Sequence, residues 1–268
     1  VDPAVLVICR LLGITQVFRI NGPAGIAALG FGTESIPKVR KVVGPGSPAV
    51  TLAQVEMQRH GLATMMLLGP TESLVVADDT AHVGRLASDL LIEAEHGTDS
   101  SVVLVCTSQD IIDAVENELQ IQIGDLPANR AEACRASLGD NGGAILVASL
   151  TEAIEVANLY APEHCQVAVS AQHEEMVVDG ITNAGEILIG QHTPFSAGKF
   201  IIGAPASLPT SGFEHVSSGI TVEAFLKRTA VAQANEPALR RMADNIIAFA
   251  DHEGFPAHGN AIRRRFSL

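Results

Sequence analysis

Short apolar runs alternate with amphipathic segments through most of the chain. The most strongly apolar run, Val102–Cys106, predicts a buried strand, and four further runs resemble it: Leu74–Ala77, Ala144–Ala148, Gln166–Val169 and Glu186–Ile189. Helix-like segments separate these runs. Repeated strand–helix units of this kind are typical of a parallel, doubly wound sheet. The pattern therefore predicts an α/β fold.

Helix signals occupy the intervals between the predicted strands. Ser149 and Glu152 form a capping box ahead of a helix that extends to Tyr160. Asp2 and Pro3 suit the first turn of another helix. The predicted helices are Pro3–Leu12, a segment of small residues after Asn21, Ala49–His60, Thr80–His96, Gln109–Gln122 and Ala128–Ser137. Short additional strands are predicted at Gln16–Ile20, Lys41–Val43 and Thr64–Leu68.

The pattern changes near residue 190. Gly190–Gly219 is rich in Gly, Ser, Pro and Thr and has little periodicity. Long loops inside compact domains usually carry function. Beyond this loop, Val222–Ala234 and Glu236–His252 predict two helices, which we expect to form a small C-terminal tail segment.

Composition and net charge argue against some classes of binding partner. The net charge is −13, which argues against nucleic acid and anionic membrane surfaces as partners. No apolar run reaches the length of a membrane span. The cysteines lack CxxC spacing and lie among apolar residues, as is typical of buried free thiols in a reducing compartment. We therefore expect a soluble cytoplasmic protein. The cysteines are Cys9, Cys106, Cys134 and Cys165.

Three polar segments are candidates for binding, and we expect them at the carboxyl ends of strands, where open α/β sheets bind ligands. Gly44–Ser47 offers backbone N–H groups to an anion. Gly69–Glu72 is followed by Asp78–Asp79. Glu93 and His96 are three residues apart, so they share a helix face and could bind one metal ion. A solvated polar helix end is the simpler interpretation of that last pair.

Glu163 and His164 form a fourth polar segment. Pro162 ends the preceding helix and leaves the two residues on a short loop that enters a strand. A histidine beside a carboxylate suits general acid/base chemistry. An exposed polar loop would account for the same residues, and composition leaves both interpretations open.

Taken together, these segments resemble histidinol dehydrogenase over essentially the whole chain. The segments that carry the resemblance are Phe31–Pro37, Val42–Gly46, Gly69–Glu72, Asp89–Gly97, Asn158–His164, Asn183–Ile187, Leu208–Gly212, Glu253–Gly254 and His258. The match begins well inside the family's chain, and the start at Val1 has no initiating Met and no signal peptide. We therefore expect a divergent member that lacks the opening βα units of both Rossmann-like domains.

The resemblance implies three parts. Residues 1–70 would be a partial Rossmann-like domain on the cofactor side, and residues 71–220 a Rossmann-like catalytic and substrate domain. Residues 221–268 would be a helical tail that dimerises the protein. The family is a zinc-dependent homodimer that oxidises L-histidinol to L-histidine with NAD, in two steps through a bound aldehyde.

Roles for individual residues follow from the resemblance. His164 would accept the alcohol proton, and Glu163 would activate the water that attacks the aldehyde. Thr71 and Glu253 match positions that contact the substrate. Two side chains that contact NAD in the family are replaced here, one by Ala24 and the other by Ser47. Ser47 follows Gly46, the last residue of the Gly-Pro-Gly turn. Backbone and helix-terminus contacts could still bind the cofactor.

The family's zinc ligands are Gln, His, Asp and a tail His. His96 and His258 match the two histidines, Glu93 stands at the Gln position, and Lys199 stands at the Asp position. A protonated lysine cannot ligate zinc and repels it. We expect Lys199 to place its charge where zinc would bind, paired with Glu93. The alternative is that Lys199 points to solvent and a site of three ligands and a water survives.

Three functions compete. The first is a histidinol-dehydrogenase-like oxidoreductase that uses NAD. The second is a zinc-independent paralogue that acts on another small alcohol, whose acidic group would bind Lys199. The third is a non-catalytic binding subunit. The presence of Glu163, His164, Glu253 and His258 favours an enzyme, because a binding module would not need all four.

Overall fold

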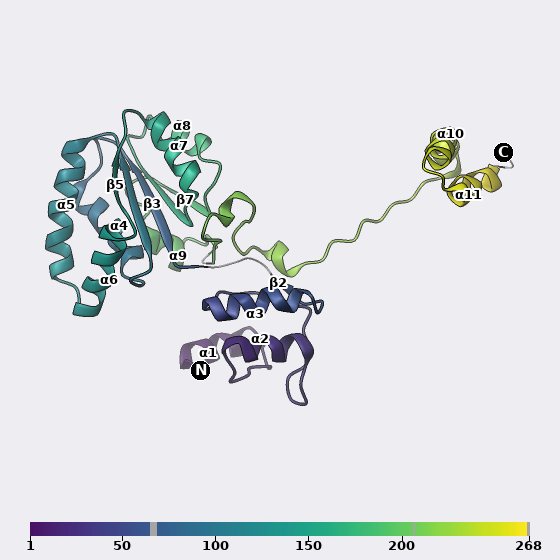
Figure 1. Ribbon diagram of the computed structural model, residues 1–268, viewed down its shortest axis with the longest axis horizontal. Coiled ribbons are helices and arrows are strands. Elements are labelled where there is room, and N and C mark those ends of the chain that lie inside the picture. The colour runs from purple at the N-terminus through teal and green to yellow at the C-terminus, as the bar shows by residue number, and fades with distance from the viewer. Residues whose placement is uncertain (65–68, 206, 267–268) are drawn as a thin grey trace. The chain divides into compact units, whose positions relative to one another are not determined.

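The computed structural model describes residues 1–64, 69–205 and 207–266. Contacts divide the chain into two compact units, Val1–Phe225 and Leu226–Leu268. Within the described residues of the first unit, a five-stranded parallel sheet has helices on both faces, which confirms the predicted α/β fold (Figure 1). Its strands, in spatial order, are β5 (Gly143–Leu146), β4 (Ser101–Cys106), β3 (Glu72–Ala77), β6 (His164–Ala168) and β7 (Glu186–Ile189).

The strand register brings polar side chains together at one edge of the sheet. The chain moves outward from β3 to β5 and then returns, so that β6 pairs with the other side of β3. Ser73 of β3 lies opposite His164 of β6, and His164 lies opposite Glu186 of β7. Because all three strands are parallel, their first residues meet at the amino edge.

Both faces of the sheet are buried. Along β3, Val75 and Ala77 pack toward one face, whereas Leu74 and Val76 pack toward the other, as the two-residue period of a strand requires. Burying each such side chain stabilises the fold by about 1.5–3 kcal/mol. One face is covered by α4 (Val83–Ala94), α5 (Gln109–Gly124), α6 (Ala128–Gly139) and α9 (Phe195–Phe200), and the other by α7 (Leu150–Tyr160) and α8 (Glu174–Gly180).

The end of α7 leads the chain into β6. Ser149 caps the start of this helix, as predicted, and accepts a hydrogen bond from the Glu152 N–H at 3.2 Å. At the other end, Ala161 adopts a left-handed conformation with φ 52°, directly before Pro162. This buried turn ends the helix and sends the next residues straight into the sheet.

The N-terminal elements form a separate small core. Ile26 and Met57 belong to an apolar cluster that packs two helices together. The predicted strand Gln16–Ile20 is wrong: the segment is irregular, and no strand in the described part of the chain pairs with it. Of the predicted strand Thr64–Leu68, all but Thr64 lies outside the described residues. The elements here are α1 (Pro3–Leu11), α2 (Gly22–Phe31), β1 (Lys41–Val42), α3 (Pro48–Gln58) and β2 (Ala63–Thr64), with β1 and β2 parallel.

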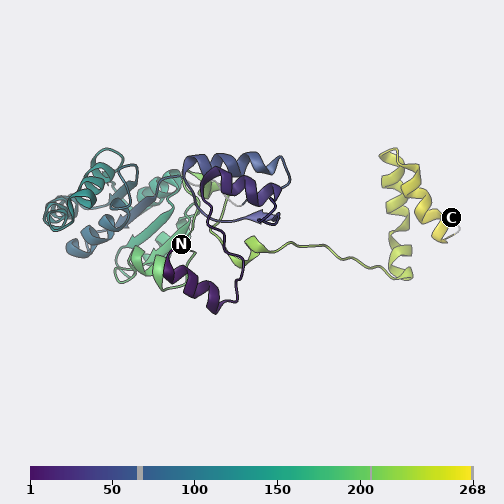
Figure 2. The same cartoon turned by 90° about the horizontal axis from the view of Figure 1, so that it is seen from below.

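The end of the chain departs from the prediction in two places. The predicted helix Val222–Ala234 is reduced to one 3-10 turn, η2 (Val222–Phe225). Residues 226–235 are all exposed, Val231 by 92%, so a helix there would gain little stability from burial. The expected α10 (Glu236–His252) is present, but Pro256 then starts an unpredicted helix, α11 (Pro256–Phe266). These two helices pack side by side in the second unit (Figures 1 and 2).

The sequence pattern also missed three short elements in the first unit. They are α8, α9 and the 3-10 turn η1 (Phe213–His215), and the last two fall inside the predicted loop Gly190–Gly219. None of the helices in the described ranges is long and apolar enough to cross a membrane.

Gly185 lets β7 approach the residues before β6. A Cβ atom there would lie 2.5 Å from the Glu163 carbonyl oxygen and 3.1 Å from Leu208 Cβ. We predict that Gly185→Ala lowers the free energy of unfolding by about 1–3 kcal/mol in urea denaturation, because backbone must move to make room. Gly124→Ala, which places its Cβ in open space, is the matched control. Equal stability of the two variants would show that the approach is not tight.

Candidate active site

A buried imidazole lies at the centre of the amino edge of the sheet. His164 is 1% exposed, and its Nδ1 lies 2.5 Å from Glu186 Oε1. The register explains this contact, because the two residues are direct neighbours on β6 and β7. An ionised carboxylate only accepts hydrogen bonds, so Nδ1 carries the proton and Nε2 faces away from Glu186. Among the described residues, Nε2 has no hydrogen-bond partner.

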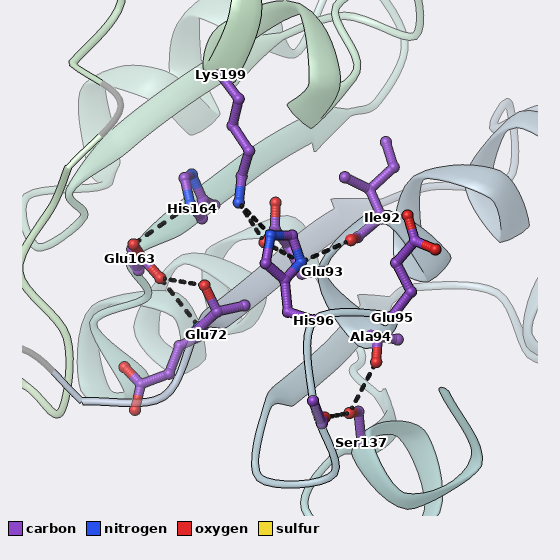
Figure 3. Close-up of polar contacts among 12 residues, drawn as sticks. Glu72, Ile92, Glu93, Ala94, Glu95, His96, Ser137, Glu163, His164 and Lys199 are labelled. Atoms are coloured by element: carbon purple, nitrogen blue, oxygen red, sulfur yellow. Dashed lines mark hydrogen bonds and ion pairs between the residues drawn. The ribbon is translucent and has the colours of Figure 1, made fainter. Parts of the chain in front are cut away.

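Glu163 lies beside this free ring nitrogen. Its Oε1 is 3.5 Å from His164 Nε2, and its Oε2 accepts hydrogen bonds from Thr71 Oγ1 at 2.9 Å and from the Glu72 N–H at 3.2 Å. The close-up in Figure 3 shows the carboxylate between His164 and the start of β3. Thr71, a predicted substrate residue, is therefore adjacent to the predicted acid/base pair.

The surroundings of His164 favour its charged form. Burial by itself lowers the pKa of the imidazole, but the Glu163 carboxylate close to Nε2, the hydrogen bond to Glu186 and the negative charge of Glu93 outweigh it. The pKa of His164 rises from its ordinary value of 6.5 to about 9. At neutral pH this group is an imidazolium, and it becomes a proton acceptor as the pH approaches 9.

Two further carboxyl groups are close to Glu163. Glu214, in η1, is 7% exposed, and neither of its oxygens has a partner in the described part of the chain. Burial, together with the charges of Glu72 and Glu163, raises the pKa of Glu214 to about 7. Burial and the charge of Glu163 also raise the pKa of Glu72, against a hydrogen bond from the Ser211 N–H. The site therefore holds a carboxyl group that titrates near neutrality.

A second cluster contains the predicted metal-site residues. Lys199 Nζ donates a 2.7 Å hydrogen bond to Glu93 Oε2 and lies 3.3 Å from His96 Nε2. Figure 3 shows the lysine extending from α9 so that its ammonium reaches Glu93 and His96. The predicted pairing of Lys199 with Glu93 is confirmed, and Lys199 does not point away into solvent, since its side chain is 15% exposed.

Both clusters lie at the amino edge, so the expectation that the polar segments gather at the carboxyl ends of strands is wrong for them. The reason is the direction of the helices. A helix that follows a parallel strand runs back across the sheet, and the end of α4 thus brings Glu93 and His96 to the amino edge. Asp78, at the carboxyl end of β3, is instead occupied by hydrogen bonds from Thr80 and the Ser170 N–H.

Known proteins match the chain from end to end. The profile of the family described as histidinol dehydrogenase matches residues 1–266. Histidinol dehydrogenase from Clostridium acetobutylicum is 38% identical over 267 residues, and the protein of that name from Synechocystis sp. is 39% identical over 269 residues. The crystal structure of histidinol dehydrogenase from Elizabethkingia anophelis superposes with a TM-score of 0.95 at 34% identity.

The chain belongs to the histidinol dehydrogenase family. The alignments cover 99% and 100% of this chain but 61% of each of the two relatives, and the structural match covers 100% of this chain and 60% of the other. The chain thus spans about three fifths of the length of the family members that it matches.

The expected tail residues belong to the second unit. Glu253 ends α10 and His258 lies in α11, with its ring 5.2 Å from the ring of Phe255. Both are exposed, and both line an open hollow of about 440 Å³ between the two helices of the unit. A substrate or dimer role for this tail in the histidinol dehydrogenase family stays a prediction for the present chain.

The expected NAD residues lie around the N-termini of two helices. Ala24 is exposed in α2, and Gly46 and Ser47 precede α3. Gly44 has φ 139°, and a Cβ on Gly46 would lie 2.3 Å from Val50, so this turn requires glycine. Ser47 makes no capping hydrogen bond. The N-terminal end of α3 and the Ser47 side chain are suited to an anionic group such as a dinucleotide phosphate.

The zinc ion implied by the histidinol dehydrogenase family does not fit the residues around Lys199. The ammonium lies at hydrogen-bond distance from Glu93 Oε2 and close to His96 Nε2, the two atoms that a metal would need. Within the described ranges, no three His, Cys, Asp or Glu side chains are grouped to hold a metal ion.

Two site residues escaped the sequence reasoning. The sequence pattern places Glu186 at the start of a strand; a charged residue at the head of an apolar run is the signal that could have identified it. Glu214 follows no periodic pattern, and nothing in its neighbours predicts burial. Glu72 lay in a recognised polar segment but had no assigned role.

The raised pKa of His164 links stability to pH. The charged form of His164 adds on the order of 3 kcal/mol to the free energy of unfolding. This contribution is fully present below pH 6.5 and is lost as the pH rises through about 9. We predict that Glu186→Gln lowers the midpoint of the His164 titration, followed by NMR, and shrinks this loss in urea denaturation. Glu175→Gln, an exposed change on α8, is the control. An unchanged His164 midpoint in Glu186→Gln would contradict the assignment.

Proposed function

We propose that the chain is the catalytic part of an NAD-dependent oxidoreductase that oxidises a small amino alcohol through an aldehyde to an acid. L-Histidinol, converted to L-histidine, is the substrate that membership of the family favours. The observation that carries the proposal is the buried His164, which Glu186 holds on one side while the other ring nitrogen is free beside Glu163.

His164 is proposed to accept the hydroxyl proton of the alcohol on Nε2. Glu186 fixes the ring and stabilises the charge that the ring gains, as a carboxylate behind a catalytic histidine does. Each of the two oxidations, of the alcohol and of the hydrated aldehyde, would require a hydride acceptor, which NAD would supply when bound. The Gly44–Ser47 turn and the exposed face near Ala24 are the proposed cofactor contacts.

Glu163 is proposed to act on the aldehyde, by taking a proton from the water that attacks it. Thr71 and the Glu72 N–H hold one carboxylate oxygen, which leaves Oε1 for the water. Thr71 borders the same space and is a proposed substrate contact. Lys199 is a further proposed contact.

The tail is proposed to complete the site of a second copy in a homodimer. Glu253 and His258 would then contribute contacts to substrate from the partner, as the resemblance implies. We also propose a cytoplasmic location. The four cysteines are free thiols, and burial raises the pKa of Cys134 to about 11 and that of Cys165 to about 12, which suits a reducing compartment.

The Lys199–Glu93 pair favours a second candidate, a metal-independent paralogue that oxidises a different small alcohol. An ammonium at this position selects for an oxygen-rich or acidic group on the substrate. The same catalytic pair would serve this reaction.

We predict that His164→Asn lowers kcat by about 10²–10⁴-fold with L-histidinol and NAD, because the proton acceptor is lost while the apolar packing is kept. NADH formation gives the rate, and circular dichroism checks the fold. The control is His173→Asn, a half-buried histidine after β6 that contacts Ser170.

The wild-type protein decides between the candidate substrates. NADH formed from another small alcohol but not from L-histidinol would support the paralogue. A rate in His164→Asn close to that of wild type would place the proton acceptor elsewhere, and no NADH from any alcohol tested would refute the proposed function.

A further inference from the structure

The region between Glu93 and His96 is organised around a positive charge. Glu93 is 0% exposed, and a buried carboxylate requires a counter-charge. Lys199 supplies it through the 2.7 Å contact to Oε2. The other carboxylate oxygen, Oε1, is buried and has no partner among the described residues. Glu93 can therefore accept a further hydrogen bond at Oε1, next to the ammonium.

His96 is oriented toward the same point. Its Nδ1 lies 3.0 Å from the Ile92 carbonyl oxygen. A carbonyl only accepts hydrogen bonds, so this contact places the ring proton on Nδ1 and leaves the lone pair on Nε2. That lone pair faces Lys199 Nζ at 3.3 Å. Fixing one ring nitrogen on a carbonyl is the usual way in which proteins aim the other at a cation.

The positive charge between Glu93 and His96 is the ammonium of Lys199, a residue of the chain itself. A divalent ion within reach of Glu93 and His96 would lie against the ammonium, and the repulsion between the two charges opposes binding. An ammonium also has three N–H donors, of which Glu93 and His96 use two. The third has no partner that the described residues provide.

We propose that the Lys199 ammonium is the resident cation of this site, excludes a divalent metal, and donates its third N–H to an oxygen of the bound alcohol. The second half of this inference, the hydrogen bond to the alcohol, rests on the proposed function. The first half, the exclusion of a divalent metal by the ammonium, does not. In Figure 3 the Lys199 side chain extends past His164 toward Glu93 and His96. In the proposed arrangement one alcohol oxygen meets both the ammonium and Nε2 of His164. The ammonium stabilises the negative charge that develops on this oxygen as His164 removes the proton.

Zinc titration of the chelator-treated full chain tests the first half without any turnover. By isothermal titration calorimetry, wild type should bind no zinc at this site, and Lys199→Asp should gain one zinc that the double variant with His96→Ala loses. Lys38→Asp, an exposed lysine given the same charge change, should gain none. Because Lys199→Asp adds a carboxylate beside buried Glu93, Lys199→Ala is a second variant that should also gain zinc affinity dependent on His96.

Two results would overturn this half of the proposal. The first is one zinc bound by wild type and lost in His96→Ala. The second is a failure of both folded Lys199 variants to gain zinc, which would mean that the ammonium is not what excludes the metal.

Turnover tests the second half. Chelator treatment should leave NADH formation by wild type unchanged, and Lys199→Met should lower kcat/KM by about 10²–10³-fold, whereas Lys38→Met should not. Inhibition by chelator that zinc reverses would overturn the inference while the proposed function stands. Absence of turnover together with the predicted zinc results would refute the proposed function while the ammonium site stands.

Discussion

The neutralisation of buried carboxylates governs the candidate site. Glu93, Glu163, Glu186 and Glu214 are all buried, with exposed fractions of 0–8%, and they gather at one edge of one sheet. Water cannot solvate them there, so their charges must be paired or removed. Glu93 is paired by Lys199, Glu163 and Glu186 share an imidazolium, and Glu214 retains its proton to near neutral pH. Each group thus takes the ionisation state that its neighbours permit.

The fold creates this crowding through strand order. β6 returns between β3 and β7, so a residue that heads one strand touches residues that head the other two. The backward direction of α4 then adds Glu93 and His96 to the same edge. Glu163, Glu186 and Glu93, from three separate parts of the chain, thereby act on one imidazole, and the rigid, doubly covered sheet holds them in place.

Prediction from the sequence succeeded where local chemistry decides structure. Apolar runs identified β3 to β7, and Pro162 located the turn that presents Glu163 and His164. The Lys199–Glu93 pair followed from a charge argument, once the resemblance had aligned their positions. Glu186 could not be found in this way, because its role depends on a strand register that spacing does not reveal. The predicted helix Val222–Ala234 stops at Phe225 because the residues after it are exposed and would bury no helix face, which propensity cannot anticipate.

The two clusters are coupled through Glu93. This carboxylate holds Lys199, and its charge is also one of those that raise the pKa of His164. Without a counter-charge, Glu93 would act on the imidazole at full strength and favour the imidazolium, which cannot accept a proton. An ammonium beside Glu93 weakens that field and so makes the neutral, basic form of His164 easier to reach. The same charge that opposes a metal therefore also adjusts the base that the proposed reaction requires.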